Sequence, residues 1–277
     1  MIGQLFRGLK HRRRIARALA GLEAPAPEAR PHGLPGPLVV SLTSHAARFG
    51  TLKPTLQSIL RQDIRPDAVI LWVGQDDLDQ LPRNIRDLPG LELRSCRDLR
   101  SYTKIVPTLR AHPDAHVVTA DDDVHYEQGW LAGLVDAARN GAAVACHRAH
   151  RVAMEAPGRP APYDMWDHNI DAPDAGPQVF LTGVCGVIYA PGALHPDVLR
   201  DDLFTTLAPS SDDVWLYWMH RLNGVEAVKI GGRRRILEWE GSQDICLRQT
   251  NTQAGTGNDR AIAALMDRYG WPGGAKA

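Results

Sequence analysis

Four short apolar runs alternate with helix-like patterns over residues 37–120, and this alternation constrains the fold more than any other feature. The runs are PLVVSL, AVILWV, LELRSC and AHVVTA, each of strand length. Apolar residues recur with the helical period between the first two runs, and another helical pattern precedes the fourth. Such β-α-β punctuation predicts an α/β fold in which helices flank a sheet.

The later part of the chain continues with a predicted helix over 129–140 and a strand-like run over 142–149, and it becomes more irregular from Arg151. With 277 residues, of which 44% are apolar, the chain is long enough to bury one large core. We therefore expect a single domain over 38–270, with one half at 38–125 and the other at 126–270.

The first 22 residues depart from the neutral average of the chain, because they carry six lysines and arginines and no acid before Glu23. On a helical wheel most of these cations lie opposite an apolar side made of Ile2, Leu5, Leu9, Ala16 and Leu19, with Arg12 as the exception. Residues 1–23 are predicted to form a basic helix, which either lies on an anionic membrane surface or is an ordinary soluble tail. Residues 24–37 are rich in Pro and Gly and are predicted to be a linker.

The whole-chain composition limits the partners and the compartment. The 32 basic and 32 acidic residues cancel, which argues against a nucleic-acid partner. Four cysteines lie far apart without a C-x-x-C pair, as in proteins of a reducing cytoplasm. No apolar run approaches the roughly 20 residues needed to span a bilayer. We expect a cytoplasmic protein that is at most peripheral on the inner face of the membrane.

Three adjacent acids, Asp121, Asp122 and Asp123, directly follow the fourth strand-like run. In open α/β sheets, ligands bind at the carboxyl ends of the strands. Three carboxylates there repel one another, so a positive partner is expected, and Mg²⁺ or Mn²⁺ with its preference for hard oxygen ligands is the simplest one. The alternative is an acidic loop that caps the following helix.

A second acidic pair, Asp212 and Asp213, opens the predicted helix in SSDDVWLYWMHRLNG, with Ser211 as its cap and Asn223-Gly224 as its end. An ionised carboxylate in a first turn can accept a proton from an attacking hydroxyl. Helix capping is the alternative interpretation of the pair.

Glycines and basic residues complete the set of candidates. Gly183 and Gly186 interrupt an apolar stretch, which marks either a close approach of another molecule, such as an acceptor sugar, or a tight bend in the core. Arg48 and Lys104 follow predicted strands on the same edge as the three acids, where they could reach a diphosphate; solvated side chains are the alternative.

The order of the motifs VVSLTSHAARF, LRSYTKIVPTL, VVTADDDV, CHRAHR, FLTGVCGVIYAPGALHPDVL, SSDDVW and GSQ resembles that of bacterial glycosyltransferases related to the inverting family two. The resemblance covers roughly residues 38–260. It implies the GT-A fold, a Rossmann-like mixed sheet flanked by helices, with 38–125 as the nucleotide-binding half and 126–270 as the acceptor half. It also implies a hexosyltransferase type of enzyme with a nucleotide-sugar donor, a UDP-sugar first of all, and a saccharide or lipid-linked saccharide acceptor, in surface polysaccharide or glycolipid synthesis.

The resemblance also implies roles for single residues. VVTADDDV resembles the D-x-D motif, in which Asp121 and Asp123 would hold the metal and Asp121 and Asp122 the donor. SSDDVW is similar to the E-D motif, which implies Asp213 as the general base, with Asp212, Trp215 and Gly183 at the acceptor. Thr43, Arg48 and Lys104 would contact the donor. The usual acid after the second strand is replaced by LWVGQDDL, where Asp76 or Asp77 would take its place.

Three other functions remain as rivals. An Asp-x-Asp after an apolar strand also opens phosphatases of the haloacid-dehalogenase type, although there it stands near the start of the domain. A nucleotidyltransferase would use a similar fold and metal and release pyrophosphate. A non-catalytic, membrane-associated sugar-binding protein would use the basic helix.

Overall fold

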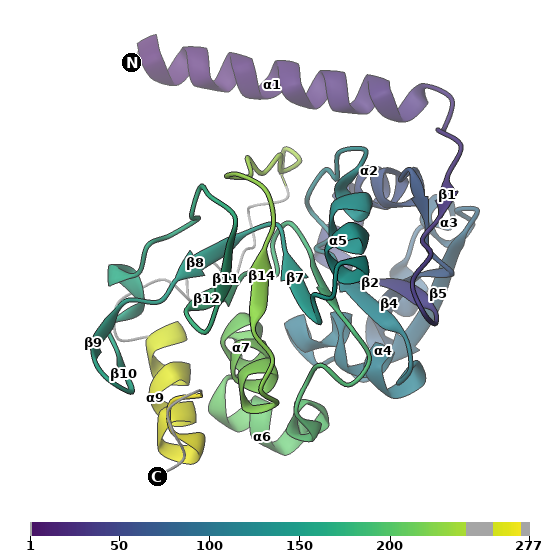
Figure 1. Cartoon of the computed structure of the whole chain (residues 1–277). Helices are drawn as coiled ribbons and strands as arrows, with labels where there is room; N and C mark the ends of the chain where they lie inside the picture. Colours follow the sequence, from purple (N-terminus) through teal and green to yellow (C-terminus); the bar gives the residue numbers. More distant parts are fainter. Residues whose placement is uncertain (1, 242–256, 273–277) are drawn as a thin grey trace.

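A computed structural model describes residues 2–241 and 257–272, with the side chains of residues 8 onward in the first range, and places an eight-stranded mixed sheet at the centre of the molecule (Figure 1). In sheet order the strands are β11 (Asp174–Gly176), β14 (Ala227–Lys229), β7 (Val144–Cys146), β13 (Val187–Tyr189), β6 (His116–Thr119), β2 (Leu38–Ser44), β4 (Ala68–Gly74) and β5 (Leu91–Cys96). Strands β6, β2, β4 and β5 are parallel to one another, and β13 is antiparallel to both of its neighbours. Strands β7 and β14 are parallel, and β11 is antiparallel to β14. The predicted α/β class is confirmed.

The four apolar runs of the first half are β2, β4, β5 and β6. The run at 142–149 is not one strand as predicted, because the chain bends at His147 between β7 and β8 (Ala149–Arg151). β8 leaves the main sheet and pairs with β12 (Val179–Leu181) in a two-stranded sheet. The remaining short elements are β9 (Met154–Ala156), β10 (Arg159–Pro160), η1 (Ala46–Arg48), η2 (Gln75–Gln80), η3 (Arg100–Lys104), η4 (Tyr163–Met165) and η5 (Pro196–Leu199).

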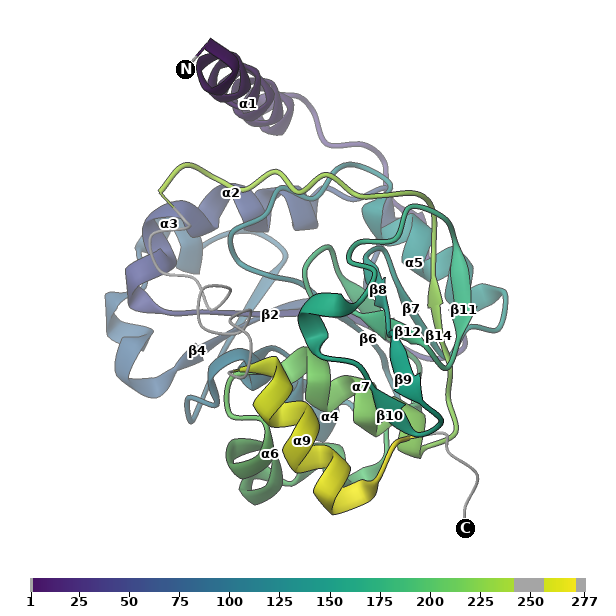
Figure 2. The same ribbon diagram turned by 90° about the vertical axis from the view of Figure 1, so that its left-hand side faces the viewer.

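Helices cover both faces of the sheet (Figures 1 and 2). One face packs against α2 (Phe49–Leu60), α3 (Arg83–Arg86) and α5 (Trp130–Arg139), and the other against α4 (Val106–Ala111), α6 (Asp201–Leu207), α7 (Asp212–Leu222) and α9 (Asn258–Tyr269). Successive side chains of β13 point to opposite faces of the sheet and so contribute to the hydrophobic cores on both faces. Val187 and Tyr189 pack on the side of α7, and Ile188 packs on the side of α2. Both layers leave the carboxyl ends of the parallel strands at one edge.

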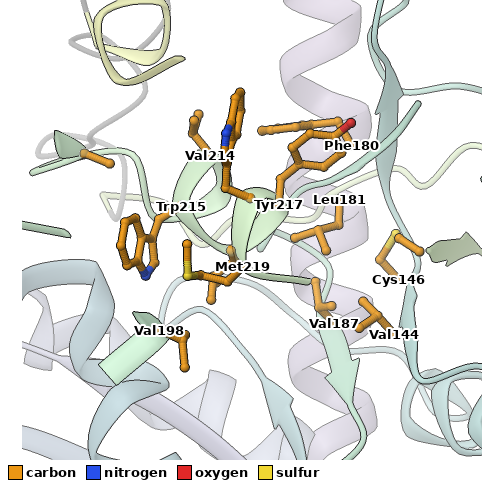
Figure 3. Close-up of a cluster of buried hydrophobic side chains, with 14 of the residues drawn as sticks. Val144, Cys146, Phe180, Leu181, Val187, Val198, Val214, Trp215, Tyr217 and Met219 are labelled. Atoms are coloured by element: carbon orange, nitrogen blue, oxygen red, sulfur yellow. The ribbon is translucent and has the colours of Figure 1, made fainter. Parts of the chain in front are cut away.

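Helix α7 is buried over almost its whole length, with every residue from Val214 to Arg221 inside the protein. Figure 3 shows its side chains among those of β12, β13 and β7. Full burial of one large apolar side chain contributes roughly 1.5–3 kcal/mol, so this packing fixes the helix firmly. The helix ends at Leu222, and Gly224 follows with φ +76°. The predicted helix is confirmed, and its first turn is held rigidly at the sheet edge.

Helix α1 (Ile2–Glu23) lies along the outside of the molecule, away from the sheet (Figures 1 and 2). Its Ala18 packs with Leu237 and Trp239, and Ile15 and Leu22 lie against them. The predicted linker is partly ordered, because β1 (Arg30–Pro31) pairs with β3 (Ile64–Arg65). Among the described residues, no helix combines the length and the apolar character that a bilayer crossing requires.

Candidate active site

The three acids Asp121–Asp123 follow β6 after Ala120, beside the end of β2 and the start of β13. Asp122 is buried, and the Ser44 hydroxyl at the end of β2 donates to its Oδ2 at 2.6 Å. Arg48 Nη1 lies 2.8 Å from Asp122 Oδ1 and 2.7 Å from Asp123 Oδ2. Part of the positive charge expected at these acids is therefore supplied by the protein itself.

Lys104 joins the two acidic motifs. Its Nζ lies 3.0 Å from Asp121 Oδ1 and 3.1 Å from Asp212 Oδ2, and its side chain is only 9% exposed. Burial alone would lower the pKa of Lys104, but the charges of Asp121, Asp212 and Asp213 outweigh it and raise the pKa well above its usual value. The lysine remains protonated and holds the end of β6 against the first turn of α7, an ion pair between residues far apart in the sequence.

Asp213 lies next to this bridge. The Gly183 N–H donates to its Oδ1 at 2.8 Å. Burial, and then the charge of Asp212, raise the pKa of Asp213 to about 7, although Lys104 and the Gly183 N–H act in the opposite direction. A carboxyl group with a pKa near neutrality is suited to accept and release a proton at physiological pH.

Residue 183 is a glycine because a side chain at this position would collide with its neighbours. A Cβ added to it would lie 3.0 Å from Asp213 Oδ1 and 3.0 Å from Lys104 Nζ. Gly186 has φ +90°, and a Cβ there would lie 2.6 Å from the Trp130 ring. The close approach predicted at Gly183 is thus made by the charged cluster, whereas Gly186 accommodates the core. The contact of Gly183 with an acceptor stays a prediction.

The cluster of acids retains a surplus of negative charge. Burial, followed by the charges of Asp121 and Asp122, raises the pKa of Asp123 to about 6 despite the ion pair with Arg48. Within the part of the chain that is described, no three His, Cys, Asp or Glu side chains converge on a point that could hold a metal. Two carboxylates with surplus charge nevertheless suit Mg²⁺ or Mn²⁺, which usually keep waters and substrate phosphate oxygens among their ligands. That Asp121 and Asp123 would be the protein ligands of such an ion stays a prediction.

The other residues predicted at the donor lie on the same edge. The half-buried Thr43 near the end of β2 donates through Oγ1 to the Trp72 carbonyl at 3.0 Å. Asp76 is exposed in η2, directly after β4, while the Ala46 N–H donates to Asp77 Oδ2 at 3.2 Å. The parallel strands β2 and β4 bring these residues to one edge, as expected, and their contact with a nucleotide stays a prediction.

The prediction that Trp215 contacts an acceptor is wrong. Its side chain is 0% exposed and packs in the core with Val198 and Met219 around it (Figure 3), and its ring makes an edge contact with Phe204. The apolar stripe of α7 includes this position, so burial outweighs exposure to a cleft. Ser211 is the N-cap residue, but contrary to expectation its side chain makes no capping hydrogen bond.

Sequence analysis missed a segment that crosses the acidic loop, which we call the strap (residues 233–241). His125 N–H donates to the Leu237 carbonyl at 2.9 Å, and Trp239 N–H donates to the Asp123 carbonyl at 3.2 Å. The Trp239 ring N–H donates to Thr55 Oγ1 at 2.7 Å, which ties the strap to α2. Most of the GSQ motif at 241–243, like the following DICLRQTN, lies outside the described residues.

Ser44 and Tyr126 were also missed. The Asp121 N–H donates to the Tyr126 hydroxyl at 2.7 Å, so both residues hold the backbone or side chains of the acidic loop. Ser44 had a weak sequence signal, because it follows an apolar run in the same way as the acids do. Tyr126 had none, since its role depends on the loop turning back on itself.

No protein-family model matches the chain, and no curated protein does so either. Among solved structures, a mannosyltransferase from Pyrobaculum calidifontis in complex with GDP-Man and Mn²⁺ shares 18% identity at a TM-score of 0.35, over 47% of this chain and 40% of that one. A 4-diphosphocytidyl-2C-methyl-D-erythritol synthase shares 13% identity at a TM-score of 0.45, over 84% and 99% of the two chains. Its counterpart from Anaerococcus prevotii shares 11% at 0.42, over 75% and 92%. These names are those of enzymes, and likenesses of this strength say nothing about the chemistry of this chain.

Proposed function

We propose that the protein is a metal-dependent glycosyltransferase of GT-A type, which transfers a sugar from a nucleotide-diphosphate sugar to an acceptor hydroxyl with inversion. The observation that carries the proposal is the Lys104 bridge. It places Asp121, at the end of β6, and Asp212, in the first turn of α7, on either side of one ammonium group. A donor site and an acceptor site built on these two motifs would therefore adjoin each other.

The donor would bind at the ends of β2, β4 and β6. Asp121 and Asp123 would hold Mn²⁺ or Mg²⁺, which when bound neutralises the charge of a diphosphate leaving group. Asp122 is held in place by Ser44 and Arg48, and from there it would contact the donor. Thr43 and Asp76 would face the nucleotide, for which a UDP-sugar is the first candidate.

The acceptor would bind at the first turn of α7. Its hydroxyl oxygen attacks the anomeric carbon of the donor sugar, the bond from that carbon to the phosphate oxygen breaks, and the hydroxyl proton passes to Asp213. The leaving group is the nucleoside diphosphate. Because the pKa of Asp213 is about 7, its carboxylate is a strong enough base to take up that proton near neutral pH. Asp212, fixed by Lys104, would orient the acceptor, which we propose to be a saccharide or lipid-linked saccharide of a surface polysaccharide or glycolipid.

The experiment that tests the proposal follows the fate of the nucleotide. The purified protein is incubated with Mn²⁺ and UDP-, GDP- or dTDP-sugars in the presence of candidate saccharide acceptors. Parallel incubations contain a nucleoside triphosphate with a sugar phosphate, or a simple phosphate monoester, and all products are separated by chromatography. Release of the nucleoside diphosphate, abolished by EDTA and by Asp123→Ala, is expected. Release of pyrophosphate from a nucleoside triphosphate and a sugar phosphate would instead establish a nucleotidyltransferase, and phosphate release from a simple monoester would establish a phosphatase. A nucleotide sugar that raises the melting temperature without turnover under any acceptor tried would favour a sugar-binding protein.

A further inference from the structure

Helix α1 has two sides with different surroundings. Along its described half, Arg14, Ile15, Ala18 and Leu22 are wholly or partly shielded by the body, where Ala18 and its neighbours cover Leu237 and Trp239 of the strap. These positions recur with the spacing of one helix face. Only this face of α1 therefore packs against the rest of the protein, and the opposite face is exposed to solvent.

The solvent side of α1 carries large apolar side chains. Leu9 is 48% exposed and Leu19 is 41% exposed, and together with Met165 they are the exposed large hydrophobic residues of the described chain. Ala16 is exposed between them. Exposure of two leucine side chains to water does not stabilise the protein, so this side of the helix is suited to a partner that offers apolar surroundings.

Cations occupy other exposed positions of the same helix, most of them opposite the side that carries Leu9 and Leu19. Lys10, Arg13 and Arg17 are exposed on α1, and Arg12 is 76% exposed while it makes an ion pair with Glu240 of the strap. The helix has no acid in its first turn, and Glu23 at its end is its first acid. In a chain whose formal net charge is zero, this is a strong local excess of positive charge. It complements an anionic partner.

A hollow of about 410 Å³ lies beneath the helix. Arg14 and Arg17 line it from α1 and Arg61 lines it from the end of α2, and Glu127 is the single acid among its described lining residues. Basic side chains thus point both outward and into the space under the helix. The space offers room for an anionic headgroup beside the helix.

We propose that the solvent side of α1 docks on an anionic lipid bilayer, with Leu9 and Leu19 inserted among the headgroups and the long side chains of Lys10, Arg13 and Arg17 reaching the lipid charges from the polar side of the helix. An amphipathic helix of this composition lies in the plane of the interface. The docking requires neither donor nor acceptor and so extends beyond glycosyl transfer. In addition, and resting on the proposed function, the strap contacts both α1 and the acidic loop, so docking brings the catalytic edge toward acceptors anchored in the same bilayer.

Flotation of the full-length protein with vesicles tests the docking without any transfer reaction. Vesicles of phosphatidylglycerol and phosphatidylcholine are compared with pure phosphatidylcholine vesicles. Two double variants, Leu9→Gln/Leu19→Gln and Arg13→Gln/Arg17→Gln, leave the packed residues of α1 intact. The matched control, Arg65→Gln/Arg83→Gln, removes two exposed cations elsewhere on the surface. Deletion of the helix is avoided because it would uncover Leu237 and Trp239.

The wild type and the control should float with anionic vesicles and not with neutral ones. The arginine variant should lose about thirtyfold in partition coefficient, since each cation near an anionic leaflet contributes roughly fivefold. The leucine variant should lose at least about tenfold. Equal flotation of all four proteins, or equal binding to both kinds of vesicle, would overturn the proposal. So would a wild type that fails to float but forms dimers that the leucine substitutions dissociate, because the face would then belong to a second copy.

Discussion

Replacing Asp213 with asparagine is the most informative perturbation of the site. The variant keeps the size of the side chain and an oxygen that can accept the Gly183 N–H, which lies 2.8 Å from Oδ1 in the wild type. It removes only the ability to take up a proton. If Asp213 is the general base, turnover should fall by about 10²–10⁴-fold, the usual contribution of such a group. Melting temperature and donor affinity should remain near the wild-type values or rise.

The pH dependence separates this role from a structural one. Because the pKa of Asp213 is about 7, the rate constant kcat/KM of the wild type should rise roughly tenfold per pH unit below 7 and level off above it. The residual rate of Asp213→Asn should show no such rise. The same pKa affects stability, because a carboxyl group whose folded pKa is raised binds more protons when folded, so its contribution to stability is lost as pH rises through that pKa. The asparagine variant should therefore gain more in melting temperature at pH 8 than at pH 5.

The assay measures release of the nucleoside diphosphate between pH 5 and 9, with Asp164→Asn as the matched control. Asp164 is exposed in η4, so its substitution should leave both rate and profile unchanged. A turnover of Asp213→Asn within a few-fold of the wild type, or the same rise through pH 7 in both proteins, would refute the assignment of the base. A product that retains the anomeric configuration of the donor would refute the single displacement.

Three further predictions concern the charged cluster. Lys104→Met should lower the free energy of unfolding by about 3–5 kcal/mol, because it leaves buried carboxylates without their counter-charge, and urea titration measures this loss. Gly183→Ala should reduce turnover at least tenfold and also lower the melting temperature, because its Cβ would lie 3.0 Å from Asp213 Oδ1 and from Lys104 Nζ. Gly50→Ala, at which an added Cβ meets nothing within 4 Å, should leave turnover unchanged, and equal rates for the two would show that the close packing at Gly183 has no catalytic importance. Asp123→Ala should abolish the Mn²⁺ dependence of donor binding in calorimetry, and donor affinity that is indifferent to both EDTA and this substitution would exclude the metal site.

Local patterns predicted the framework of the site well. AHVVTA became β6 and delivered Asp121–Asp123 to the sheet edge, and the first turn of α7 begins at Asp212. Periodicity gave no information on partners distant in the sequence, so the ion pairs of Arg48 and Lys104 with acids of the protein were not foreseen, and the contact of both with a diphosphate stays a prediction. The misplacement of Trp215 has a related cause.

A helix that is buried nearly all round has no polar side to mark its inward face. In α7 the residues from Val214 to Arg221 are all buried, so an aromatic residue next to the acids could not be distinguished as a cleft or a core residue from its position alone. The split of the run at 142–149 was hidden for another reason: His147 and Arg148 interrupt the apolar run at the bend, but no Gly or Pro marks a turn there, and the chain goes on into a second small sheet.

The strap has a consequence for the order in which the protein is completed during synthesis. Synthesis proceeds from the N-terminus, so β6 and Asp121–Asp123 are made long before Leu237 and Trp239. Until the strap is available, the backbone of the acidic loop lacks the hydrogen bonds at His125 and Asp123 that fix it. A fragment that ends before residue 237 would contain every side chain assigned to the reaction and still lack their final arrangement. If the proposed reaction is correct, such a fragment would be inactive, because the acidic loop would lack these hydrogen bonds.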